Sequence, residues 1–149
     1  MSNTDFTPDQ KVIAAISNSI SFMLGRGSRA AMREAGKAAS HDLWEDLPEN
    51  ASKEQVSQVM HEGVQALKGF GEFNIVGNDD DSYTIAFKNC GFSAFTETSG
   101  EPCGQQPICY FGFGLVEETL RRMTGQKFQV TLTKRDDSTG TCHEVAMPR

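Results

Sequence analysis

The 149-residue sequence is short of positive charge, has few cysteines and contains no long apolar run. Its 14 Lys and Arg residues are outnumbered by 20 Asp and Glu, and the net charge of −6 repels phosphate backbones. We therefore expect no nucleic-acid partner. No apolar run approaches the ~18 residues of a membrane-spanning helix, so we expect no membrane span. The polar, acidic start lacks the basic residues and apolar core of a secretory signal, so we expect a cytoplasmic protein.

The scarce cysteines, Cys90, Cys103, Cys109 and Cys142, should be reduced in the cytoplasm. They are expected to be core residues, metal ligands or redox thiols. Cys142 and His143 are adjacent, and adjacent strand residues point to opposite faces. We therefore do not expect His143 to act as the general base for a Cys142 nucleophile. The sequence has no phosphate loop, dinucleotide fingerprint or metalloprotease motif. An enzyme that acts alone is therefore the less favoured class.

Hydrophobic periodicity predicts three helices, a hairpin, a fourth helix and a second hairpin. We expect the helices from Pro8 to about Gly25, Ser28 to about Trp44, Ser52 to Gly69 or Gly71, and Pro107 to Gly125. The strands are expected at residues 73–76, 83–88, 127–133 and 141–147, with 89–95 as a further candidate. Residues 1–9 are expected to form a disordered tail, and residues 10–149 one domain. This order predicts an α+β fold with helices packed on one face of an antiparallel sheet.

Small side chains crowd the second predicted helix, at positions 30, 31, 35, 36, 38 and 39. Small faces let helices approach closely. This face therefore either packs against another helix of the same chain or forms a homodimer interface.

Aromatic residues gather where the predicted sheet meets the fourth helix: Phe70, Phe73, Phe87, Phe92, Phe95, Tyr110, Phe111 and Phe113. They either fill an ordinary core or line a ligand cavity. His61 lies on the third helix next to its apolar stripe. It is either a histidine at the edge of the core or a polar contact for a hydroxyl-bearing ligand.

The last third of the chain carries a specific pattern. Cys109 opens a helix that contains Gly112 and Gly114, Gly125 ends it, a strand follows, and a turn at Gly140 leads to Cys142. In this pattern the chain resembles the 4-vinyl reductase-like (hydrocarbon-binding) domain family. That family is related to subunits of the vesicle-tethering complex TRAPP and to the sensor domains of phenol-responsive activators. The resemblance implies the TRAPP-like fold, a ligand-binding fold of nitric-oxide signalling and Golgi transport.

The resemblance also implies a function. It implies a domain that pairs into homodimers through its N-terminal helices and encloses a hydrophobic or aromatic small molecule. The implied ligand contacts are His61, Phe87, Phe92, Tyr110, Phe111 and Phe113. We expect a cytoplasmic binding or sensory domain that acts through an unidentified protein partner. The alternatives are an enzyme or accessory factor in tetrapyrrole (bacteriochlorophyll) metabolism, and a TRAPP-like interaction module without a ligand.

Zinc-binding members of the resembled family use the early cysteine, a Glu-x-x-Cys on the next strand and the final cysteine. Cys109 and Cys142 match the first and last of these positions, but the middle two fall on Thr131 and Lys134, which are not zinc ligands. Cys90, Cys103 or His143 would have to complete a site. We therefore expect no zinc, with Cys109 and Cys142 as small core residues, and leave any other cofactor unknown.

Overall fold

The structure is a computed structural model that describes residues 8–67, 70–90 and 104–149. Phe92, Phe95, Cys103 and most of the candidate strand at 89–95 lie outside the described residues. The first described helix begins at Pro8, two residues before the expected domain boundary.

Four α-helices are described, close to the predicted positions: α1 (Pro8–Leu24), α2 (Ser28–Leu43), α3 (Lys53–Gln65) and α5 (Pro107–Thr124). A 3-10 turn, Gly25–Gly27, joins α1 to α2. A capping box starts α3, because the Ser52 hydroxyl accepts from the Gln55 amide while the Gln55 side chain accepts from the Ser52 amide. Gly125 ends α5 at a left-handed φ of 76°.

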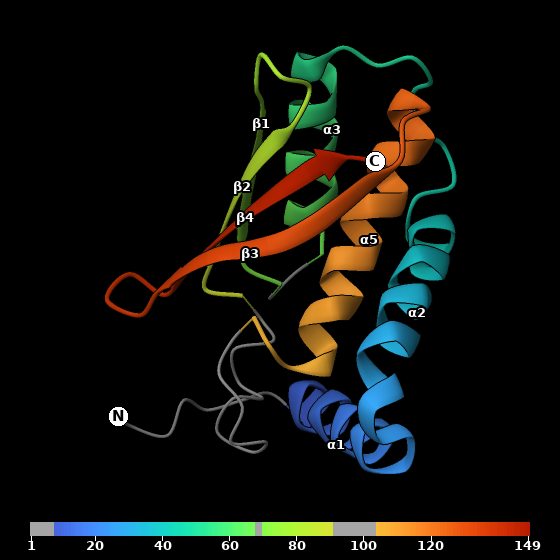
Figure 1. Ribbon diagram of the computed structural model, residues 1–149, viewed down its shortest axis with the longest axis vertical. Helices are drawn as coiled ribbons and strands as arrows, with labels where there is room; N and C mark the ends of the chain where they lie inside the picture. Colours follow the sequence, from blue (N-terminus) through green and yellow to red (C-terminus); the bar gives the residue numbers. More distant parts are fainter. Residues whose placement is uncertain (1–7, 68–69, 91–103) are drawn as a thin grey trace.

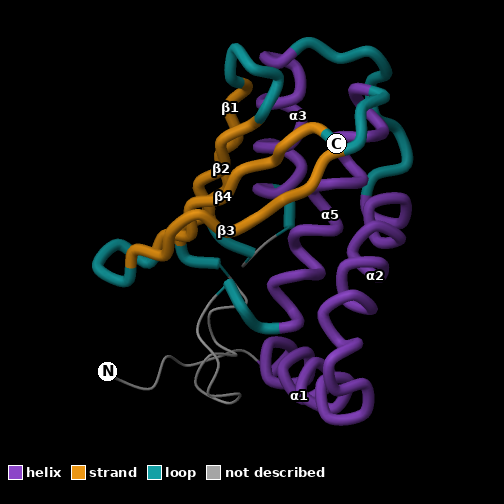
Figure 2. Tube along the Cα trace, viewed as in Figure 1, coloured by secondary structure: helices purple, strands orange, loops and turns teal. Residues whose placement is uncertain are grey.

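The four described strands form one antiparallel sheet of two hairpins. They are β1 (Glu72–Gly77), β2 (Tyr83–Lys88), β3 (Phe128–Asp136) and β4 (Thr141–Pro148), in the order β1-β2-β4-β3. Both predicted hairpins are present, and the pairing of β2 with β4 joins them (Figure 2). Strand β3 is therefore an edge of the sheet.

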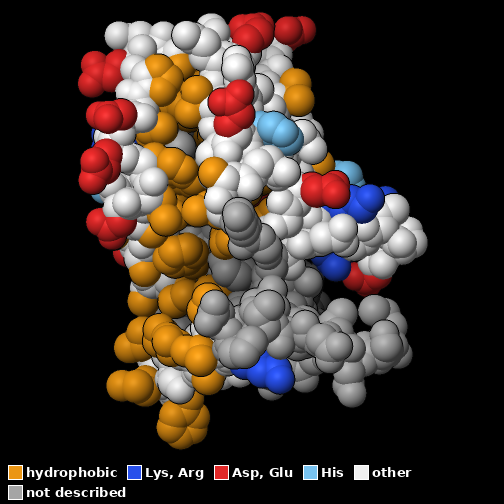
Figure 3. Space-filling model, turned by 180° about the vertical axis from the view of Figure 1, so that it is seen from behind, with side chains coloured by type: hydrophobic (Ala, Val, Ile, Leu, Met, Phe, Trp, Pro, Cys, Tyr) orange, Lys and Arg blue, Asp and Glu red, His pale blue; other side chains and the backbone are white. Residues whose placement is uncertain are grey.

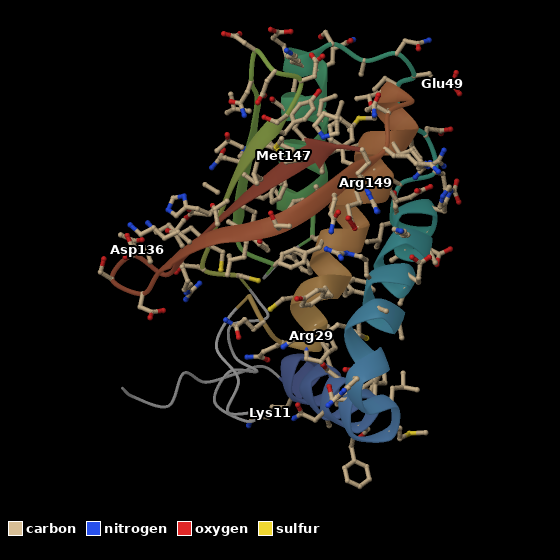
Figure 4. The ribbon with its side chains drawn as sticks, viewed as in Figure 1. Lys11, Arg29, Glu49, Asp136, Met147 and Arg149 are labelled. Atoms are coloured by element: carbon tan, nitrogen blue, oxygen red, sulfur yellow. The ribbon has the colours of Figure 1, made fainter. Side chains whose placement is uncertain are left out.

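The helices lie on one face of the sheet, as predicted (Figure 1). Helix α3 packs on β1, α5 packs on β3, and α2 packs on α5. The inward residues of the first hairpin are all buried: Phe73, Ile75, Tyr83, Ile85 and Phe87. Val76 and Met147 are exposed, and Met147 projects from β4 near the end of the chain (Figure 4). The predicted α+β fold class is confirmed.

Helices α2 and α5 approach each other through two glycines. A Cβ atom on Gly36 would lie 2.0 Å from the Phe111 carbonyl oxygen, and one on Gly114 would lie 1.9 Å from that of Arg33. The buried residues of α2 are Ser28, Met32, Gly36 and Ser40, at four-residue spacing. Alanines 30, 31, 35 and 38 are exposed, so most of the small face predicted from the sequence points away from α5.

Helix α1 leaves many apolar side chains uncovered. The most exposed are Phe22 at 91% and Met23 at 79%, and Val12, Ile13, Ile16 and Leu24 are also exposed. Hydrophobic side chains gather over the α1 end of the molecule and continue upward along one side (Figure 3). Among the described helices, none is long and apolar enough to cross a membrane.

Candidate ligand pocket

A small apolar cavity lies between α5 and the sheet. Its free volume is about 40 Å³, room for a few non-hydrogen atoms given that a water occupies ~30 Å³ in the liquid. The described residues that line it are Phe73, Phe87, Cys90, Gly104, Cys109, Gly112, Phe113, Val116, Cys142 and Glu144. The cavity is therefore walled by β1, β2, β4, α5 and the turn before α5.

Aromatic rings form much of the wall. The Phe87 ring lies 5.7 Å from Phe70 in a stacked arrangement and 5.7 Å from Phe73 edge to face. On the helix side, the Phe113 ring lies 5.2 Å from Tyr110. Such pairs fix the ring positions beyond what apolar burial alone would do. Phe87 and Phe113, both predicted ligand contacts, thus line the cavity, and their ring positions are fixed by neighbouring aromatic rings.

Tyr110 and Phe111 lie elsewhere around α5. The Tyr110 ring is covered by two guanidinium groups, from Arg29 at 5.3 Å and Arg33 at 5.2 Å. Arg29 is near the α1 end of α2 (Figure 4). Phe111 packs in a separate cluster with Met32 and Ile108, toward α2. Neither side chain is among the described residues that line the cavity.

His61 is exposed on α3 and is likewise not part of the described lining. Its Nδ1 atom lies 2.7 Å from the Phe73 carbonyl oxygen, to which it can donate a hydrogen bond. The histidine therefore links α3 to β1. Its contact is with the backbone beside the cavity rather than with the cavity itself.

Three described cysteines line the cavity: Cys142 from β4, Cys109 from α5 and Cys90 from the segment after β2. The Gly104 amide donates to Cys109 Sγ at 3.2 Å, and Arg135 Nη1 donates to Cys142 Sγ at 3.2 Å. Gly104 has a φ of 88°, and a Cβ there would lie 2.3 Å from Leu132 Cδ2. Glycine is thus required at the turn that aims this amide at Cys109.

Glu144 brings a carboxyl group to the same cavity and is 9% exposed. No residue in the described parts of the chain forms a hydrogen bond or ion pair with this carboxyl, and burial raises its pKa to about 8. Sequence reasoning missed Glu144. The available signal was strand alternation, which places it on the same inward face as Cys142 and Ala146.

The positions of the family's Glu-x-x-Cys lie away from the cavity. Thr131 pairs with Val145 and Lys134 with His143, on the opposite face of the sheet from Glu144, and both are exposed. In residues 8–67, 70–90 and 104–149, no group of three or more His, Cys, Asp or Glu is placed to hold a metal ion. Cys109 and Cys142 both line the cavity, but Thr131 and Lys134 cannot join them there.

Comparison with known proteins supplies structural neighbours only. No family model matches the chain, and no curated protein is similar to it in sequence. The fold is similar to trafficking protein particle complex subunit 3 from Naegleria fowleri covalently bound to palmitic acid, with 10% identity, TM-score 0.60 and 95% of each chain covered.

Two further neighbours are structures of an H-NOX protein from S. oneidensis. The Fe(II)NO state has 13% identity and TM-score 0.57 over 92% of this chain and 74% of that one. A Q154A/Q155A/K156A mutant in the Fe(II) state has 11% identity and TM-score 0.55 over 90% and 70%. The resemblance to the 4-vinyl reductase-like family thus rests on the sequence pattern, while the structure shows the fold that this chain shares with a TRAPP subunit and H-NOX proteins.

Proposed function

We propose that this domain binds a small hydrophobic molecule in the cavity between α5 and the sheet. The observation that carries the proposal is an apolar cavity, walled by rings of Phe73, Phe87 and Phe113, that also contains a buried carboxyl without a partner among the described residues. Pockets of this make-up, mostly apolar with a few polar groups, are typical of small-molecule sites. The TRAPP subunit, which has the same fold, is covalently bound to palmitic acid, and this supports a hydrophobic ligand.

The size of the cavity limits the ligand. About 40 Å³ takes a small molecule or one segment of a larger one. A tetrapyrrole is far larger, so a role in tetrapyrrole metabolism would need a large rearrangement of α5 and the sheet. If the domain is instead a TRAPP-like interaction module with a filled core, no small molecule should bind.

The proposal includes sensing through a protein partner in the cytoplasm. The trafficking neighbour is itself a subunit of a complex, which supports a role in protein assembly.

A homodimer formed through α1 is the second part of the proposal. Asp9 and Lys11 are the charged residues among the 17 of α1, and its exposed residues include Ile16, Phe22 and Met23. Two copies that each carry a net charge of −6 repel least where their surfaces are uncharged. A second copy of this chain therefore fits the α1 face.

Native mass spectrometry of freshly purified protein tests ligand binding, followed by titration with a hydrophobic fluorescent probe. Gly112→Met should fill the cavity from α5 and abolish binding of both ligand and probe. Thr84→Met, at an exposed position of β2, is the matched control and should bind as the wild type does. A wild-type protein with no bound mass and no probe binding would overturn the proposal.

A further inference from the structure

We infer that the molecule bound in this cavity presents an uncharged oxygen, most simply a carbonyl group, to the Glu144 carboxyl. The inference rests on the proposed function and deepens it by naming the chemistry of the ligand. Its basis is the position of one carboxyl group among described lining residues that are otherwise apolar side chains, cysteines and glycines.

Glu144 is held where none of the described residues offers its carboxyl a partner. Its neighbours across the sheet are Ile85 on β2 and Leu132 on β3, both apolar. The side chain is 9% exposed, and no described residue bonds to its carboxyl. A buried polar group in this state is destabilising until something supplies the missing hydrogen bond. A ligand in the cavity is placed to do so.

The charged groups around the cavity and the burial of Glu144 determine the protonation state in which its carboxyl contacts the ligand. Among the described lining residues, the titratable groups besides Glu144 are the thiols of Cys90, Cys109 and Cys142, and none is Lys, Arg or His. The nearby cation, Arg135 on β3, donates to the Cys142 sulfur. With burial raising the pKa of Glu144 to about 8, the carboxyl is mostly protonated at neutral pH. It therefore offers an O–H donor.

This donor discriminates among ligand head groups. A carboxylate ligand would enter a cavity whose described lining has no cation to pair with it. An ammonium ligand would require Glu144 to ionise in apolar surroundings, which burial opposes. An uncharged carbonyl oxygen accepts from the protonated carboxyl and leaves no charge in the cavity. A hydroxyl oxygen can accept in the same way.

The test compares matched aromatic probes by NMR titration of the full chain. Each probe offers the cavity one segment of two or three non-hydrogen atoms, which is the size that about 40 Å³ takes. Acetophenone carries a carbonyl in that segment, ethylbenzene lacks it, and benzoate and phenylethylammonium carry opposite charges there. At about pH 6.5, where Glu144 is protonated, we expect acetophenone to bind about tenfold more tightly than ethylbenzene, the effect of one net hydrogen bond. Neither charged probe should bind more tightly than ethylbenzene.

Variants and pH then identify the donor. Glu144→Met should remove the preference for acetophenone at every pH. In the wild type the preference should also disappear at about pH 9.5, where the carboxyl is ionised and no longer donates. Glu144→Gln keeps an amide donor that does not titrate, so its preference should persist at both pH values. It also controls for ionisation of the three thiols.

The outcomes separate this inference from the proposed function. If neither acetophenone nor ethylbenzene binds, the proposed function fails and the inference with it. If both bind equally at about pH 6.5, the cavity is a ligand site but the inference is wrong. A preference for phenylethylammonium, or a wild-type preference for acetophenone that survives at high pH, would also overturn it.

Discussion

Arg33 on α2 and Glu117 on α5 form a buried ion pair, 2.9 Å from Nε to Oε1, and both side chains also bond to the backbone of Val130 on β3. Arg33 Nη2 donates to the Val130 carbonyl at 2.9 Å, and the Val130 amide donates to Glu117 Oε2 at 3.2 Å. Because β3 is at the edge of the described sheet, no described strand pairs with these backbone groups on that side. One ion pair therefore joins two helices to the edge of the sheet.

Removing the cation should destabilise the fold strongly. Arg33→Met leaves the Glu117 carboxylate and the Val130 carbonyl buried without their donor, and we expect the free energy of unfolding to fall by about 3 to 5 kcal/mol in urea denaturation. Burial already raises the pKa of Glu117, and Arg33 opposes that rise. Lys37→Met, which removes an exposed pair with Glu34, is the control and should cost less than about 1 kcal/mol. Equal losses in the two variants would contradict the structural role of the buried pair.

The glycine contact between α2 and α5 gives a second prediction. Gly36→Ala and Gly114→Ala each place a methyl group about 2 Å from a backbone oxygen of the other helix, so the helices must separate. We expect a loss of about 1 to 3 kcal/mol for each variant in thermal or urea denaturation, despite the better helix propensity of alanine. Gly27→Ala is the matched control, because nothing lies within 4 Å of the added atom. A stability equal to that of this control would show that the helices are not in close contact.

Much of the fold could be predicted because its signals are local. The apolar stripe of α3, its capping box and the alternation of both hairpins each lie within a few residues. The pairing of β2 with β4 is not a local signal, and periodicity alone does not supply it. The packing of α2 on α5 is not a local signal either, because it depends on the close approach of each helix backbone to Gly36 and Gly114 of the other.

The site was predictable only in part, because it too depends on contacts between elements that are distant in the sequence. Helix α5 lies between α2 and the sheet, so Cys109 and Phe113 face the cavity while Phe111 packs toward α2. The sequence shows these residues as one aromatic group without showing which neighbour each one meets. Glu144 was missed because an acidic residue in a strand is usually solvent-facing, and here it is buried.

The α1 face gives a prediction about assembly. Ile16→Asp and Phe22→Asp place a charge in the exposed apolar surface, and we expect each to convert a dimer to a monomer in size-exclusion chromatography with light scattering. Val76→Asp is the control, because Val76 is 60% exposed on the sheet and distant from α1. Circular dichroism should show that all three variants remain folded. A monomeric wild type at the concentrations used would contradict a dimer formed through α1.

Glu144 should make the empty protein less stable as pH rises. Below its ordinary pKa of 4.5 the carboxyl is protonated in both the folded and unfolded states, so it adds no pH dependence. Between 4.5 and about 8 the folded protein holds a proton that the unfolded chain has released, and its contribution to the free energy of unfolding falls by up to about 1.4 kcal/mol per pH unit. Above that window both states are ionised and the dependence ends.

Urea denaturation of wild type and Glu144→Gln across this window measures the effect. Because the other titrating groups are common to both proteins, the variant should gain stability relative to wild type steadily from pH 4.5 to about pH 8. Glu118→Gln is the control, because the pKa of Glu118 is shifted in the opposite direction: the hydrogen bond from Arg121 lowers it to about 2. The stabilisation that Glu118 gains from Arg121 is complete above 4.5 and is lost as pH falls toward 2, so this part of its difference from wild type should stay constant where that of Glu144 changes. The pair of Glu118 with His41 is removed from the comparison by measuring both variants in a His41→Gln background. A difference for Glu144→Gln that also stays constant between 4.5 and 8 would show that the Glu144 carboxyl is ionised in the folded protein and cannot act as the donor in the cavity.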